Sequence, residues 1–333
     1  MAYETEKQRP TPLLAPTNEL QQQDNTMNKL QYQYLPNAPL NEADVIIFPV
    51  PMEATVSFKG GTAEGPEAIM ATTDQLEYYE EDGQWCPFLH MRVAVIDAFV
   101  TQIEGESEAA MHQRLFEETN KLPHTNLLIA LGGEHSITPA IVQARMPTPG
   151  TIVHLDAHAD IRETFHGSEY NHACPMHRLA KQGHKILSAG IRSVYEGEAE
   201  RIKNDPNVTM FMDRQLYRPA EWQRYMDTLK SLTGPVFLTI DMDAFDPALV
   251  SGVGTPQPGG LSWHQTLDIV EALLYNPNIE LRGADIVELA PEASCVSAMT
   301  AAKLMQKIIS HWGKSKGYDQ RPQAGSQAGM GDL

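Results

Sequence analysis

Short apolar runs alternate with amphipathic stretches along most of the chain. Eight of these runs have the length and aliphatic composition of buried strands, and they cover residues 44–50, 92–96, 126–131, 151–155, 185–189, 207–212, 235–240 and 283–287. Helices are predicted between them, over residues 66–79, 106–120, 139–144, 220–232, 263–274 and 297–311. This alternation predicts an α/β fold with a mostly parallel sheet that helices cover on both faces.

The pattern also predicts how the chain divides. No internal repeat and no Gly/Ser linker interrupts it, so we expect a single domain over residues 41–312. Residues 1–40 are polar and rich in proline, which predicts a tail or an irregular arm lying on a neighbour. Residues 313–333 are rich in Gly, Gln and Ser, which predicts a flexible C-terminal tail.

Composition narrows the possible functions. The net charge of −18 argues against binding to nucleic acid or to an anionic membrane, and it is compatible with a small cationic substrate. The three cysteines, Cys86, Cys174 and Cys295, are too widely spaced for a disulfide framework or a thiolate metal site. We find no signal-peptide pattern and no apolar run of the ~20 residues needed to span a bilayer, so we expect a cytoplasmic protein.

Candidate chemistry begins where the fourth predicted strand ends. Asp156, His158 and Asp160 occupy alternate positions there, and side chains two apart on an extended backbone point the same way. Open α/β sheets bind their ligands at this end of the strands. Such a cluster would repel itself without a cation, although a solvated turn could also contain this pattern.

Two other predicted strands end in similar groups. Asp241 and Asp243 follow the run at 235–240, and His135 follows the run at 126–131. Four aspartates match the charge of two divalent cations better than that of one structural Mg²⁺. Oxygen and imidazole ligands without thiolates suit Mn²⁺. Two ions about 3.5–4 Å apart can activate a shared water, so the pattern favours a hydrolase.

These segments resemble the signatures of the ureohydrolases, the family that includes arginase and agmatinase. The matching segments are GGEHS at 132–136, DAHAD at 156–160, DMDAFDP at 241–247, GTPQPGGL at 254–261 and DIVELAP at 285–291. The resemblance covers roughly residues 44–312. It implies a three-layer α/β/α domain with an eight-stranded parallel sheet, assembled as a trimer or a pair of trimers.

The resemblance also implies two manganese ions per subunit, or Ni²⁺ or Co²⁺, whose ligand preferences overlap. The first ion would be held by His135, Asp156, Asp160 and Asp241. The second would be held by His158, Asp156, Asp241 and Asp243. A hydroxide between the two metals would attack the guanidinium carbon of the substrate and produce urea and a primary amine.

Two further residues acquire roles from the resemblance. Glu288 would bind the guanidinium through paired N–H bonds, although an isolated Glu at a strand end is usually structural. The leaving amine needs a proton, and His166, His172 and His177 are candidates to deliver it. The surrounding segment is more similar to agmatinases than to arginases, which favours His172. Cys174 is expected to pack.

The choice of substrate depends on the loop at 161–171. It lacks the Ser- and Asn-bearing pattern of arginases and is similar to an agmatinase subgroup, which favours cleavage of agmatine to putrescine and urea. Glu163 and Glu169 would suit the distal cation of agmatine, or could simply face solvent. Arg162 could instead bind a carboxylate, so 4-guanidinobutyrate stays an alternative, as do arginine and guanidine. Single-zinc deacetylases and a non-catalytic polyamine binder are competing classes.

Overall fold

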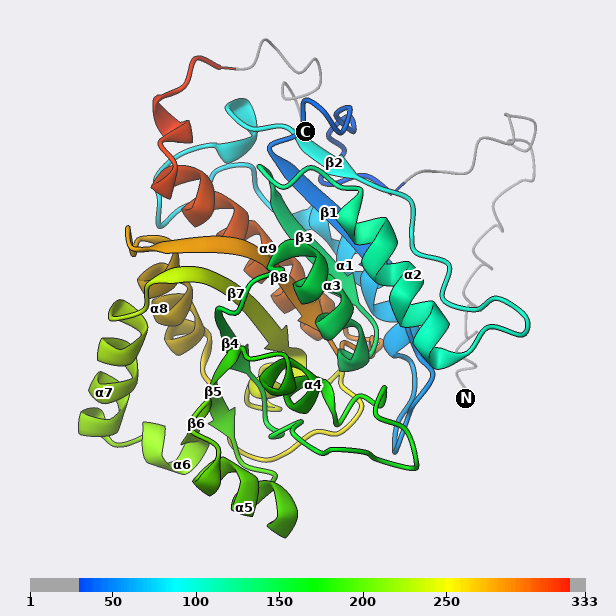
Figure 1. The fold of residues 1–333 in the computed structure, drawn as a ribbon. Coiled ribbons are helices and arrows are strands. Elements are labelled where there is room, and N and C mark those ends of the chain that lie inside the picture. The colour runs from blue at the N-terminus through cyan, green and yellow to red at the C-terminus, as the bar shows by residue number, and fades with distance from the viewer. Residues whose placement is uncertain (1–29, 324–333) are drawn as a thin grey trace, which may run out of the picture.

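The computed structural model describes residues 30–323 and contains all eight predicted strands. They are β1 (Val45–Val50), β2 (Val93–Val95), β3 (Leu127–Gly132), β4 (Thr151–Leu155), β5 (Lys185–Ile191), β6 (Val208–Met212), β7 (Gly234–Asp241) and β8 (Ile279–Val287). They form one sheet in the order β2-β1-β3-β8-β7-β4-β5-β6 (Figure 1). Every pairing between these strands is parallel, which confirms the predicted class.

Helices cover both faces of the sheet and complete three layers. One face packs against α1 (Gly65–Thr72), α7 (Pro219–Lys230), α8 (Trp263–Leu274) and α9 (Val296–Ser315). The other packs against α2 (Glu108–Asn120), α3 (Thr138–Arg145), α4 (Pro175–Lys181) and α5 (Glu196–Asn204). The short helix α6 (Asp213–Leu216) connects β6 to α7. The predicted α/β/α arrangement is therefore confirmed.

The central strands are apolar at nearly every position because both of their faces are buried. In β1, Val45 and Ile47 enter the core on the α9 side, whereas Ile46 and Phe48 enter the core on the α3 side. Alternate side chains of a strand point to opposite faces, so one run supplies both cores. This double burial explains why strand positions were easy to predict.

The helix boundaries differ more from the prediction. Helix α1 ends at Thr72, before the predicted Tyr79, and a 3₁₀ turn follows it. Helices α4, α5 and α6 were not predicted, because α4 and α6 are short and α5 is largely polar. None of the helices in residues 30–323 is long and apolar enough to cross a membrane.

Both predicted tails are partly folded. Tyr32 is fully buried and its ring lies 4.9 Å from that of Phe88, so residues 30–40 pack on their own domain. At the other end, α9 continues to Ser315 and a 3₁₀ turn covers Tyr318–Gln320. The remainder of both predicted tails, residues 1–29 and 324–333, lies outside the described residues.

The strand order creates a crevice where the candidate motifs meet. After β3 the chain crosses to β4, and β8 and β7 lie between these two strands. A reversal of strand order of this kind leaves a ligand-binding crevice at the carboxyl ends of the strands. The four neighbouring strands β3, β8, β7 and β4 each end in one of the signature segments.

Candidate functional site

The first group of candidate ligands surrounds His135. Its Nδ1 lies 3.2 Å from Asp156 Oδ2, 3.2 Å from Asp160 Oδ2 and 3.4 Å from Asp241 Oδ2. This Nδ1 is buried and makes no hydrogen bond to any described residue, whereas Nε2 lies 2.9 Å from Thr239 Oγ1. A nitrogen aimed at three carboxylates needs a cation or a proton between them. The four side chains could therefore hold one metal ion.

A second group lies beside the first. His158 Nδ1 is 3.0 Å from Asp243 Oδ2 and 3.6 Å from Asp156 Oδ1. The ligand atoms of Asp156, His158 and Asp243 lie close enough together to hold one ion. Asp241, expected to serve both ions, falls in the first group and not in the second. Asp156 belongs to both groups.

The electrostatics of this cluster fit divalent cations. Burial and the neighbouring Asp156 together raise the pKa of Asp160 to about 7. Burial together with Asp243 and Asp156 holds the pKa of Asp241 well above its usual value. Burial alone would lower the pKa of His158, but Asp243 and Asp156 raise it to about 12. The cluster therefore favours positive charge, which protons or metal ions can supply.

Unusual backbone conformations position the cluster. Asp160 and Glu288 adopt left-handed conformations, with φ of 48° and 64°, a region that non-glycine residues seldom occupy and that often marks functional sites. Gly133 is required by close packing, because a Cβ there would lie 1.9 Å from the carbonyl oxygen of Met52. The Asp241 carboxylate accepts the N–H of Asp243 at 2.8 Å and fixes that turn.

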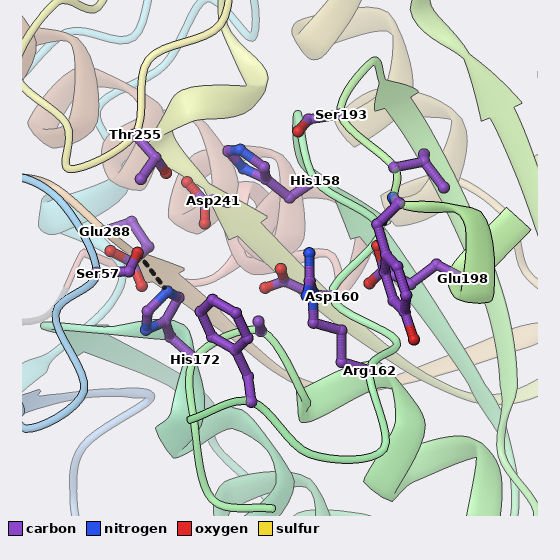
Figure 2. A pocket seen from close by; sticks show the side chains of 14 residues that line it. Ser57, His158, Asp160, Arg162, His172, Ser193, Glu198, Asp241, Thr255 and Glu288 are labelled. Atoms are coloured by element: carbon purple, nitrogen blue, oxygen red, sulfur yellow. Dashed lines mark hydrogen bonds between the residues drawn. The ribbon is translucent and has the colours of Figure 1, made fainter. Parts of the chain in front are cut away.

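Glu288 follows β8 and lines the same pocket as His158, Asp160 and Asp241 (Figure 2). Its Oε1 accepts the backbone N–H of His135 at 2.7 Å. Burial raises the pKa of Glu288 well above its usual value, and Glu134 and Asp243 add to this effect. A cationic partner would stabilise this carboxylate, as the predicted guanidinium contact requires.

The three candidate histidines lie in different surroundings. His172 lines the pocket, with Nδ1 2.9 Å from Thr55 Oγ1 and Nε2 3.2 Å from Ser57 Oγ. His166 is exposed and stacks on Phe165 outside the pocket lining, whereas His177 is buried against Arg201. The placement favours His172 as the proton donor.

The residues predicted to bind the substrate tail are placed less favourably. Glu163 and Glu169 are exposed and do not line the pocket. Arg162 does line it, with its guanidinium 4.5 Å from the Phe165 ring centre and 4.2 Å from that of Tyr195. Among residues 30–323, no carboxylate forms an ion pair with Arg162. Figure 2 shows Arg162 and the pocket-lining Glu198 across Asp160 from His172 and Glu288.

Cys174 is buried and follows the loop at 161–171. Burial raises the pKa of its thiol to about 12. A thiol with so high a pKa is a poor nucleophile at neutral pH, and its burial agrees with the predicted packing role.

Comparison with known proteins gives this geometry a context. The sequence model described as "Arginase family" matches residues 43–310, which is most of the chain. The chain belongs to the arginase family. It is an arginase-family ureohydrolase, since relatives across most of its length are named as agmatinases and ureohydrolases.

Two relatives and one structure illustrate the similarity. The chain is 36% identical to N(1)-aminopropylagmatine ureohydrolase of Synechocystis sp., over 83% of this chain and 91% of the relative. It is 31% identical to the agmatinase of Pyrococcus horikoshii, over 83% of this chain and 94% of the relative. The agmatine ureohydrolase of Thermoplasma volcanium superposes with a TM-score of 0.73 at 28% identity, over 84% of this chain and 93% of that one.

Several residues that shape this arginase-family site were not found from the sequence. His154 contacts Asp156, and Arg192 donates to the carbonyl oxygens of Asp243 and Phe245. His154 could have been found, because it precedes Asp156 by two positions and continues the alternation. Nothing local in the sequence marks Arg192, which reaches the site from the segment after β5.

Proposed function

We propose that this arginase-family protein is a binuclear manganese hydrolase that converts agmatine and water to putrescine and urea. The observation that carries the proposal is the convergence of six imidazole and carboxylate side chains from β3, β4 and β7. They form two adjacent groups, each of which could hold an ion. The carboxylate of Glu288 at the end of β8 supports a guanidinium substrate. The names of the relatives support a substrate of the agmatine type.

The residues of the chain have distinct tasks in this reaction. Two bound divalent cations would supply a nucleophilic water at neutral pH. Glu288 binds the guanidinium and orients its carbon toward the aspartate cluster. The water adds to this carbon, and the bond from the carbon to the substituted nitrogen breaks. His172, held by Thr55 and Ser57, delivers a proton to the departing amine nitrogen.

A count of charges shows what the pocket offers the substrate tail. The four aspartates balance two divalent cations, and Glu288 balances the guanidinium. Arg162 and Glu198 then remain, one charge of each sign. Glu198 is buried and accepts the backbone N–H groups of Ile161 and Tyr195. This end of the pocket can therefore take an amine tail beside Glu198 or a carboxylate tail beside Arg162.

Two other substrates are therefore second candidates. N(1)-aminopropylagmatine is favoured by the name of the Synechocystis relative. 4-Guanidinobutyrate is favoured by the absence of an ion pair at Arg162 among the described residues, because an aromatic-clamped guanidinium is well placed to bind a carboxylate.

Urea release with added Mn²⁺, measured over agmatine, N(1)-aminopropylagmatine, 4-guanidinobutyrate, arginine and guanidine, tests the proposal. We expect the highest kcat/KM with agmatine. A far higher value with arginine or 4-guanidinobutyrate would reject an amine tail. Hydrolysis of an acetylated amine with one bound zinc would indicate a deacetylase, and binding of polyamines without any urea release would indicate a non-catalytic protein.

The assembly and the location of the protein complete the proposal. We expect trimers or pairs of trimers in solution and a cytoplasmic location. Light scattering coupled to size-exclusion chromatography measures the first, and a monomer by that method would reject it.

A further inference from the structure

We infer that His154, whose ring is held in place by Ser188, is a positioning residue for Asp156 and thereby sets the metal affinity of the whole site. This inference rests on the proposed binuclear metal site. Asp156 is the residue that the two candidate ion groups share, so whatever orients its carboxylate acts on both.

The contact geometry forms a continuous buried chain. His154 Nε2 lies 2.7 Å from Asp156 Oδ2, and His154 Nδ1 lies 2.9 Å from Ser188 Oγ. All three side chains are completely buried. His154 on β4 pairs in register with Ser188 on β5, so the sheet itself fixes the distance between them. His154 and Asp156 are two apart and project from β4 in the same direction.

The tautomer of His154 follows from its partners. An ionised carboxylate can only accept, so the hydrogen must lie on Nε2. The neutral ring then presents a lone pair at Nδ1, which accepts the hydroxyl hydrogen of Ser188. The opposite tautomer would direct a lone pair at the Asp156 carboxylate. The carboxylate thus selects the tautomer, and the buried hydroxyl, hydrogen-bonded to the other ring nitrogen, holds the ring in the orientation that donates to Asp156.

The remaining contacts of Asp156 show what this donation achieves. Its Oδ1 accepts the backbone N–H of His158 at 2.5 Å and faces the second candidate ion group. Its Oδ2 accepts from His154 and lies 3.2 Å from Nδ1 of His135 in the first group. One donor on each oxygen prevents rotation of the carboxylate. Each oxygen is thus directed toward a different group.

A direct ligand role for His154 is less consistent with these contacts. His154, His135 and Asp156 lie close enough together to be considered as a group of their own. However, both ring nitrogens of His154 already have partners, at 2.7 Å and 2.9 Å. Its ring also packs against that of His135, with the ring centres 5.3 Å apart. A supporting role fits this arrangement.

Calorimetric titration of metal-free protein with Mn²⁺ tests the inference, using His154→Phe, His154→Gln and Ser188→Ala. Loss of such a supporting contact typically weakens metal binding about 10–100-fold. We expect this loss in His154→Phe, a smaller loss in Ser188→Ala, and substantial recovery in His154→Gln, whose amide can donate. His184→Phe is the matched control, because His184 is also buried but lies at the other end of β5 and accepts from Gly150.

Each outcome bears on the inference. Two ions bound by His154→Phe with wild-type affinity would overturn it, and so would a His154→Gln variant as weak as His154→Phe. If His154→Phe fails to fold, the other two variants decide. Wild-type Mn²⁺ affinity in Ser188→Ala would then overturn the role of Ser188, and a loss of affinity in Ser188→Ala with recovery in His154→Gln would support the inference. A wild-type protein that binds no Mn²⁺ contradicts the proposed function itself, which separates the two failures.

Discussion

Replacing Glu288 by Gln should lower kcat/KM for agmatine while leaving the site assembled. Glutamine keeps the acceptor oxygen that receives the backbone N–H of His135 at 2.7 Å. It also keeps the length of the side chain on a backbone already held at φ 64°. The substitution therefore removes the negative charge and replaces the second acceptor oxygen with an amide NH2, which donates and cannot accept from a guanidinium.

The size of the effect follows from the proposed pair of N–H bonds to the guanidinium. A hydrogen bond to a charged group contributes about 1.5–3 kcal/mol, against about 0.5–1.5 kcal/mol between neutral groups. In the variant one bond loses its charge assistance, at about 1–1.5 kcal/mol, and the other is lost because the amide NH2 cannot accept, at about 1.5–3 kcal/mol. At about 1.36 kcal/mol for each factor of ten, kcat/KM should fall about 70–2,000-fold.

Urea release at a series of agmatine concentrations, with the manganese content measured on the same samples, provides the assay. Glu292→Gln is the matched control, because Glu292 also follows β8 but accepts the backbone N–H of Ser297 outside the pocket. We expect this control to stay within about threefold of the wild type. A Glu288→Gln variant within threefold of the wild type, with full metal content, would refute the guanidinium contact.

Three further predictions concern the metal cluster, the proton donor and stability. Asp243→Ala should abolish urea release while the protein stays folded, as measured by activity and circular dichroism, and unchanged release would contradict the two-metal mechanism. His172→Ala should lower kcat at least 100-fold, whereas His166→Ala should not, and equal losses would reject the assignment. Lys307→Met leaves the buried Glu80 carboxylate unpaired and should cost about 3–5 kcal/mol in denaturant unfolding. Burial would raise the pKa of Glu80, but the contact with Lys307 lowers it overall. The stabilisation from this pair is therefore present above the usual carboxyl pKa and is lost as the pH falls through the lowered pKa of Glu80. In Lys307→Met the loss of stability at acid pH should be smaller.

The fold could be predicted largely because its strands are buried on both faces. Most strands appear as runs made up mainly of apolar residues, and the alternation with helices leaves few possible architectures. Helices α4 and α6 escaped prediction because they have only seven and four residues, and α5 escaped because its sequence is largely polar. The burial of Tyr32 against Phe88 depends on a contact between distant segments, which no local pattern reports.

The candidate site was predictable to the extent that it lies on strand ends. The alternation of Asp156, His158 and Asp160 marks one face of an extended segment, and the other ligands follow neighbouring strands. The positions of Glu163 and Glu169 could not be predicted in this way. They belong to a loop that turns through left-handed conformations at His166 and Gly167, and the turn directs both carboxylates to solvent.

The most direct test of the central claim is anomalous diffraction at the manganese absorption edge from crystals grown with Mn²⁺. The account predicts two peaks about 3.5–4 Å apart, the first beside His135 and the second beside His158, with the Asp156 carboxylate between them. A single peak, or peaks away from these side chains, would contradict it.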